Sequence, residues 1–185
     1  MLKDTQKNHL ALINKDDYKS SFSAQEIGTP IGTIIAIADN KYLYTCCHIK
    51  DSKLQSIEKL LKTYSAKLTF QKNNILEKTK FELGQYFNKS LEKFSIPLKL
   101  TGTEFQKHVW QELLKIPYGK TISYQQEAIN IGKPTAFRAV ANANGKNLLP
   151  IIIPCHRVIN ANGKLGGYTG GLEKKEFLLT LEKNI

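Results

Sequence analysis

The spacing of apolar and polar residues predicts strands mixed with helices in the first half of the chain. Two apolar runs, residues 33–39 and 40–49, are joined by an Asp-Asn pair typical of tight turns, and they predict a β-hairpin. Apolar residues then recur every three or four positions in residues 52–64 and 74–88, which predicts two amphipathic helices. This mixture indicates an α/β domain.

A predicted extended segment, residues 94–100, separates the two halves of the chain. Pro97 favours an extended conformation at the residue before it. We therefore expect an N-terminal α/β domain over residues 1–97 and a second domain over 98–185. Residues 1–19 are a candidate flexible extension of the first domain.

The second half of the chain has a helical pattern. Residues 101–116 carry an apolar stripe. Residues 123–132 begin with a serine, have a glutamine three positions later and stop at a glycine, the signs of a capping box and a C-terminal cap. Residues 133–145 place Pro134 in the first helical turn, where proline is favoured. The last two segments predict a helix-turn-helix in a mainly α C-terminal domain.

The charge and cysteine content narrow the class of protein. The net charge is +11, which favours an anionic partner. No apolar run reaches the roughly 18 residues of a membrane span, and the polar N-terminus does not resemble a signal peptide. Three cysteines do not suggest a disulfide framework. These features predict a cytoplasmic protein with no membrane partner.

Arginine is rare in this lysine-rich chain. Of 27 basic residues, only Arg138 and Arg157 are arginines, so both are candidates for a role that needs the planar guanidinium group. Arg138 lies in the second helix of the predicted helix-turn-helix, whose Ala136, Ala139 and Ala143 share one face. Such a face either packs against a neighbouring element or approaches nucleic acid closely, and the basic surroundings favour nucleic acid.

Cys155 and His156 are the main candidates for chemistry. A lone cysteine is most often a small buried residue, and as a nucleophile it needs help to become a thiolate. Adjacent side chains of an extended segment point in opposite directions, so contact between the pair requires a water bridge or a turn at Cys155. Glu182 borders the apolar face of the last predicted helix and could orient His156.

A metal site is the competing use of these residues. Cys46, Cys47 and His48 could join Cys155 and His156, but their spacing lacks the C-x₂-C pattern common in zinc sites. We predict no metal.

Several motifs in fixed order carry a family resemblance. The segments IPYGKTISY, FRAV, NGKN, PCHRV and YTGGL, between about Leu98 and Glu182, closely resemble the O6-alkylguanine-DNA alkyltransferases, also called methylated-DNA–protein-cysteine methyltransferases. The resemblance implies a ribonuclease H-like N-terminal domain and a winged-helix-like C-terminal domain. It also implies a monomer without cofactors that binds double-stranded DNA in the minor groove, largely independently of sequence.

The implied activity is direct reversal of DNA damage, with the following residue roles. An alkyl group on guanine O6, or more slowly on thymine O4, passes irreversibly to Cys155 of a protein that reacts once. His156 is the water-mediated base, Glu182 orients it, Tyr124 assists the leaving guanine, and Asn147 shapes the active-site loop. Arg138 replaces the extruded base in the stack. The resemblance gives further DNA contacts to Tyr124, Thr135, Ala136, Ala139 and Asn144, and it forms the base pocket from Val158, Tyr168, Thr169 and Gly170.

Small departures from the family pattern leave these roles intact. Ala141 stands where the family often has glycine, and Leu148 where it usually has proline. Two other functions compete with alkyl transfer. One is a non-enzymatic binder of alkylated DNA, as in relatives whose cysteine is replaced, and the presence of Cys155 argues against it. The other is an unrelated Cys-His hydrolase on a basic helix-turn-helix domain.

Overall fold

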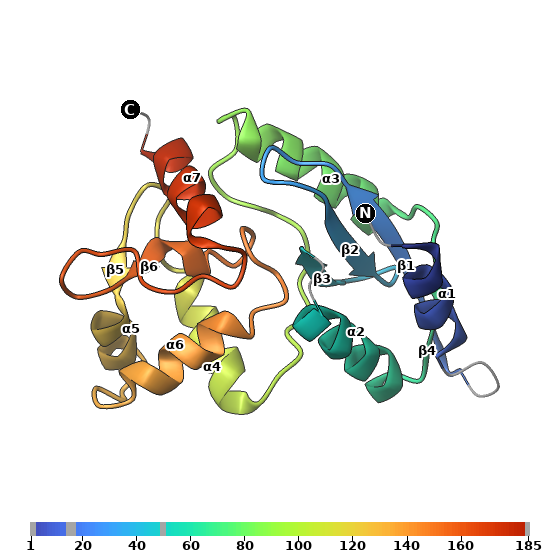
Figure 1. The fold of residues 1–185 in the computed structure, drawn as a ribbon, viewed down its shortest axis with the longest axis horizontal. Helices are drawn as coiled ribbons and strands as arrows, with labels where there is room; N and C mark the ends of the chain where they lie inside the picture. Colours follow the sequence, from blue (N-terminus) through green and yellow to red (C-terminus); the bar gives the residue numbers. More distant parts are fainter. Residues whose placement is uncertain (1–2, 14–17, 49–50, 184–185) are drawn as a thin grey trace. The chain divides into compact units, whose positions relative to one another are not determined.

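The computed structural model describes residues 3–13, 18–48 and 51–183. They form two compact units, Met1–Lys99 and Leu100–Ile185 (Figure 1). This division falls two residues after the boundary expected from the sequence. Together the units contain a mixed β-sheet and a set of helices.

A four-stranded mixed sheet organises the first unit. Its strands are β1 (Ser20–Ile27), β2 (Ile34–Ala38), β3 (Leu43–Cys47) and β4 (Ala66–Thr69), in the order β3-β2-β1-β4. The pairs β1–β2 and β2–β3 are antiparallel, and β1–β4 is parallel. Every residue of β2 and β3 is buried, which explains why their sequences are continuously apolar.

Three helices accompany this sheet. Side chains of α1 (Asp4–Leu12) and α2 (Asp51–Thr63) join the core cluster formed with the strands, while α3 (Asn74–Phe87) packs on β1 and β2. The predicted hairpin and both predicted helices are confirmed.

The proposed flexible extension over residues 1–19 is wrong for the part that the structure describes. Residues 4–12 form α1, and the side chain of Leu10 is fully buried in the core cluster. The polar sequence hid this helix because a single buried leucine is enough to anchor so short an element. Residues 1–2 and 14–17 of the expected extension lie outside the described residues.

The second unit is mainly helical. Its elements are α4 (Glu104–Leu113), β5 (Ile122–Ser123), α5 (Tyr124–Asn130), α6 (Phe137–Gly145), the 3-10 turn η1 (Cys155–Arg157), β6 (Val158–Ile159) and α7 (Leu172–Glu182). The two short strands pair in parallel. Trp110 of α4 donates its indole N–H to the carbonyl of Ala143 at 2.9 Å, which fixes α6 against α4.

The predicted helix-turn-helix corresponds to α5 and α6, but the N-terminus of each helix differs from the prediction. Ser123 accepts a hydrogen bond from the backbone of Gln126, but the Gln126 side chain donates to Asn130 and does not complete the capping box. Helix α6 begins at Phe137, so Pro134 lies in the preceding turn and not in the first helical turn. Within the described ranges, no helix is both long and apolar enough to cross a bilayer.

Candidate active site

Cys155 is presented by a tight turn and not by an extended strand. The 3-10 turn η1 begins at Cys155, where the backbone N–H donates to the carbonyl of Ile153 at 2.8 Å. Asn147 donates its side-chain amide to the same carbonyl at 2.9 Å and to Cys155 Sγ at 3.4 Å. Its own oxygen accepts from the backbone of Leu149 at 2.8 Å. The Asn147 side chain therefore fixes both the turn and the sulfur, and Cys155 is buried, with 7% of its surface exposed.

His156 is fully buried and held by one nitrogen. Its Nε2 lies 2.8 Å from Glu182 Oε1, the contact predicted from the position of Glu182 on the last helix. Nδ1 is buried and has no hydrogen-bond partner among the described residues. Because a carboxylate only accepts, Nε2 carries the proton and Nδ1 has a free lone pair. Burial lowers the pKa of His156 despite Glu182, and Arg157 and Lys175 lower it further, so the imidazole is neutral at pH 7.

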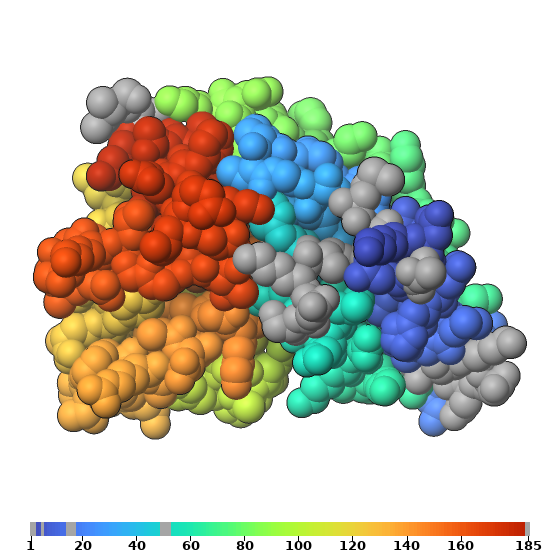
Figure 2. All heavy atoms as spheres, in the orientation of Figure 1, coloured from blue at the N-terminus to red at the C-terminus, as the bar shows by residue number. Residues whose placement is uncertain are grey.

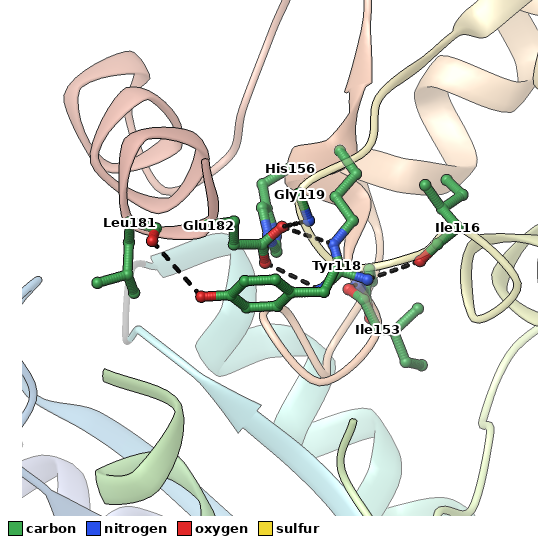
Figure 3. Close-up of polar contacts among 9 residues, drawn as sticks. Ile116, Tyr118, Gly119, Ile153, His156, Leu181 and Glu182 are labelled. Carbon is green, nitrogen blue, oxygen red and sulfur yellow. Dashed lines mark hydrogen bonds and ion pairs between the residues drawn. The ribbon is translucent and has the colours of Figure 1, made fainter. Parts of the chain in front are cut away.

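Glu182 is the hydrogen-bond acceptor at the centre of this network (Figure 3). Arg157 donates to it twice, from Nε to Oε2 at 2.8 Å and from Nη2 to Oε1 at 2.9 Å. The backbone of Gly119 donates to Oε2 at 3.2 Å. Burial alone would raise the pKa of Glu182, but the hydrogen bonds and charges of His156 and Arg157 outweigh it and lower the pKa to about 2. Glu182 is therefore an anion that orients the imidazole.

Arg157 fastens the cysteine turn to the loop after α4. Its Nη1 donates to the carbonyl of Ile116 at 2.7 Å, and its guanidinium lies over the Tyr118 ring at 5.7 Å (Figure 3). Tyr118 in turn donates to the carbonyl of Leu181 at 3.5 Å. A lysine could not make the paired contact with Glu182 and the third bond to Ile116 together, which explains an arginine here.

Gly119 is required where this loop meets α7. Its φ is +71°, a conformation that favours glycine, and a β-carbon would lie 2.9 Å from the carbonyl oxygen of Glu182. The close approach permits the hydrogen bond from Gly119 N–H to the Glu182 carboxylate.

Of the residues expected to form the base pocket, Val158 begins β6, and Tyr168, Thr169 and Gly170 lie in the segment between β6 and α7. Tyr124 donates its hydroxyl to the carbonyl of Gly167 at 3.2 Å, and Thr169 donates to the carbonyl of Gly145 at 3.0 Å. Burial and the proximity of Cys155 raise the pKa of Tyr124 to about 12, so its hydroxyl keeps its proton. Tyr168 follows Gly167 in the chain. Burial and the proximity of Cys155 raise the pKa of its hydroxyl as well.

Lys175 is a buried site residue that the sequence reasoning missed. Its side chain is fully buried, and Nζ donates to the carbonyls of Val158 at 2.6 Å and Gly167 at 3.4 Å. Burial lowers its pKa to about 8, and Cys155 partly opposes that shift. Its spacing along α7 could have revealed this burial. Lys175 precedes Leu178 by three residues and Glu182 by seven, so the three side chains lie on the same buried face of the helix. Val158 belongs to the expected base pocket, so Lys175 fixes a carbonyl at the edge of that pocket.

Helix α6 and the turn that precedes it present part of the expected DNA surface. Thr135, Arg138 and Ala139 are exposed and Ala136 is half-buried, and Figure 2 shows atoms of this orange segment at the surface of the second unit. The proposed alanine face is wrong at Ala143, which is buried against Trp110.

Asn144 also requires a correction. Its side chain, expected to contact DNA, is 6% exposed and donates to Glu127 at 2.7 Å in the interior. Its position one helical turn before the turn-forming Asn147 places it on the inner side of α6.

Nothing in the described part of the chain resembles a metal centre. No group of three or more His, Cys, Asp or Glu residues there is arranged to hold a metal ion. Cys46 and Cys47 are buried in β3, where burial raises the pKa of both thiols. The site instead combines a sulfur, a neutral imidazole and a carboxylate, which suits nucleophilic chemistry by a thiolate.

Comparisons with known proteins identify close relatives. Residues 104–184 match the family "6-O-methylguanine DNA methyltransferase, DNA binding domain". A methylated-DNA–protein-cysteine methyltransferase of Methanosarcina mazei is 41% identical over 85% of this chain and 95% of its own length. Its Methanosarcina barkeri namesake is 55% identical over 56% of this chain, and the match spans 65% of that relative's length.

Solved structures agree with these sequence matches. The structure of Mycobacterium tuberculosis OGT in complex with DNA has a TM-score of 0.75 and 37% identity, covering 89% of this chain and 93% of that one. The O6-methylguanine-DNA methyltransferase from Pyrococcus kodakaraensis has a TM-score of 0.64 and 25% identity, covering 87% and 98%.

Replacing the central carboxylate tests the network directly. Glu182→Gln leaves buried Arg157 without its counter-ion, so we expect the free energy of unfolding at pH 7 to fall by about 3–5 kcal/mol. The pKa of Glu182 is lower in the folded state, so its contribution is present above the ordinary carboxyl pKa and is lost as pH falls toward 2. Urea denaturation between pH 2 and 7 should therefore show a shallower acid decline for the variant.

The control is Glu176→Gln, an exposed carboxylate on the same helix. It should change the free energy of unfolding by less than about 0.5 kcal/mol. Equal effects of the two substitutions would contradict the central role of Glu182.

Proposed function

This chain belongs to the methylated-DNA–protein-cysteine methyltransferase family, and from that premise we propose that it repairs DNA by taking an alkyl group from guanine O6 onto Cys155. Thymine O4 is a slower substrate. The observation that carries the proposal is the anchored, neutral His156 directly after Cys155, whose sulfur is held in the cysteine turn by Asn147. No cofactor is needed, because the protein itself is the acceptor.

The thiol is activated by proton transfer through His156. The imidazole has its proton on Nε2, facing Glu182, so the Nδ1 lone pair can accept the proton of Cys155 through a bridging water. The Glu182 anion stabilises the imidazolium that forms. This arrangement also explains why the histidine is buried: in water it would titrate near pH 6.5 and lose the basic nitrogen at lower pH.

The transfer is an in-line displacement at the alkyl carbon. The thiolate forms an S–C bond as the bond from that carbon to O6 breaks, and the electron pair passes into the guanine ring. Tyr124 keeps its proton at pH 7 and donates it to N3 of the departing base. The imidazolium then returns its proton to the Tyr124 phenolate through water, and the proton on N3 moves to N1 through solvent, so the products are a thioether and unmodified guanine. Because the thioether has no leaving route, each molecule reacts once.

Access to O6 requires the nucleotide to leave the helical stack. Helix α6 is the exposed element that carries Arg138, whose guanidinium can stack and hydrogen-bond in the gap. Exposed Thr135 and Ala139 and half-buried Ala136 let the helix approach the minor groove without long side chains in between. The flipped base enters between Tyr168, Thr169 and Gly170, while Lys175 supports the pocket wall through two carbonyls.

The finer description of the fold is part of the same proposal. The strand order β3-β2-β1-β4, with only β4 parallel to its neighbour, supports a ribonuclease H-like N-terminal domain. The α5–α6 pair with the short β5–β6 ladder supports a winged-helix-like C-terminal domain. We propose a cytoplasmic monomer that binds double-stranded DNA containing O6-alkylguanine.

Mass spectrometry of the intact protein tests the reaction. Incubation with O6-benzylguanine should add one benzyl group per molecule, located on Cys155 by peptide mapping. Cys155→Ser should remove the adduct, since a serine hydroxyl is far less nucleophilic at neutral pH. Tight binding of alkylated duplex without a mass change would identify a non-enzymatic binder, and repeated turnover of an ester would identify a hydrolase.

Separate substrates isolate the role of Arg138. Arg138→Ala should slow transfer from duplex O6-methylguanine by about ten- to a hundredfold, because unstacking a base costs a few kcal/mol. The rate with free O6-benzylguanine should be unchanged, since no base is extruded. Arg138→Lys measures how much of the effect is charge. Equal loss on both substrates would show that Arg138 supports the fold and not extrusion.

A further inference from the structure

A second buried carboxylate lies between α5 and α6, away from the Glu182 network. Glu127 is fully buried, and Asn144 on the facing helix is 6% exposed. Asn144 Nδ2 donates to Glu127 Oε2 at 2.7 Å. The two remaining polar atoms of the pair, Glu127 Oε1 and Asn144 Oδ1, are both buried, and neither has a hydrogen-bond partner in the described structure.

Both atoms are acceptors if Glu127 is ionised, and two buried acceptors cannot satisfy each other. One added proton removes the conflict, because a carboxylic acid has a donor and an acceptor that match those of a primary amide. We propose that Glu127 is protonated at neutral pH and shares its proton with Asn144 Oδ1, closing a two-bond ring that positions α6 against α5. Glu127 and Asn144 are then positioning residues for the proposed DNA reaction.

The surroundings of Glu127 favour the neutral form. Of the elements packed against α5, α4 contributes Glu112, a like charge whose oxygens are held by Lys115 at 2.7 Å and Asn130 at 3.0 Å. Helix α6 carries Arg138, which is exposed, and β5 and β6 contain no titratable side chain. No lysine or arginine of the described ranges forms an ion pair with Glu127.

Burial is the main cause that raises the pKa of Glu127, to about 8; the Asn144 bond lowers it and Glu112 raises it further. The pKa of Glu182 shifts in the opposite direction, because the side chains of His156 and Arg157 both donate hydrogen bonds to that carboxylate. The proton at Glu127 is therefore retained across the neutral range and lost in mild alkali.

The position of the pair connects it to the proposed function. Glu127 lies one helical turn after Tyr124, and Asn144 one turn before Asn147, which holds the Cys155 sulfur. Loss of the shared proton would set the Glu127 anion against Asn144 Oδ1 and loosen α6 at its active-site end. The effect on DNA repair rests on the proposed function, whereas the effect on stability does not.

The sign of the pH effect follows from the raised pKa. Between the ordinary carboxyl pKa and about 8, the folded chain keeps a proton that the unfolded chain has lost, so stability falls with rising pH. Glu127→Gln retains a matching amide ring and has no proton to lose. We compare the ratio of folded to unfolded protein in the wild type with the same ratio in Glu127→Gln. The wild-type ratio, relative to that of the variant, should fall about tenfold per pH unit from pH 5.5 to 7.5 and level off above about pH 8.5.

Two further variants serve as controls in the same urea titrations. Glu104→Gln removes an exposed carboxylate of α4 and should give a curve parallel to the wild type. Glu127→Leu should be less stable than Glu127→Gln at every pH, because it leaves the Asn144 amide unsatisfied. Parallel curves for the wild type and Glu127→Gln would overturn the proposal.

Infrared difference spectra of these two proteins at pH 7 give an independent test. A carboxylic acid band present only in the wild type supports the shared proton, and the absence of this band refutes it.

The repair readout separates this inference from the proposed function. The transfer rate of the wild type on alkylated duplex, divided by the rate of Glu127→Gln, should fall severalfold between pH 7 and 9. The ionisation of Cys155 affects both proteins equally and therefore cancels in this ratio. No transfer by either protein, with the stability difference still present, would reject the repair function alone. A flat ratio with active proteins would show that the pair stabilises the fold without positioning the site.

Discussion

The buried carboxylate of Glu182 is the interaction on which the active site depends. It receives hydrogen bonds from three residues in two parts of the second unit: His156 and Arg157 of the cysteine turn, and the backbone of Gly119 after α4. An isolated anion in this position would be strongly unfavourable, and the guanidinium makes it tolerable through a paired contact. The same bonds fix the turn that presents Cys155 and select the proton position on the imidazole, so geometry and reactivity have a common origin.

Two buried glutamates of the second unit, Glu182 and Glu127, show how neighbouring groups determine charge. Glu182 meets an arginine, a histidine and a backbone N–H, and its pKa falls to about 2. Glu127 meets an asparagine amide, and its pKa rises to about 8. Ionisation suits a residue that must stabilise an imidazolium, whereas a neutral acid suits one that joins two helices. Burial is large in both cases and does not by itself determine the outcome.

Parts of this arrangement could be read from the sequence and parts could not. The apolar face of the last helix predicted that Glu182 lies beside the core, and the scarcity of arginine marked Arg157 for a specific role, because each is a local pattern. Lys175, Glu127 and Asn144 escaped the same reasoning, since a charged or amide side chain within an apolar stripe is ordinarily read as solvated. Their burial depends on contacts between α5 and α6 and between α7 and β6 that no local pattern encodes. The helix α1 was missed for a similar reason, because its one buried leucine gives no periodic signal.

One proton is central to the site: burial keeps His156 neutral, and Glu182 holds the remaining imidazole proton on Nε2, which leaves a lone pair on Nδ1. Nitrogen-15 NMR of the imidazole side chain distinguishes the two tautomers and the cation directly. In the unreacted protein, the His156 signals should be those of the Nε2–H tautomer from pH 6 to 8, with no titration near the ordinary histidine pKa. A proton on Nδ1, or conversion to the imidazolium within that range, would contradict the account.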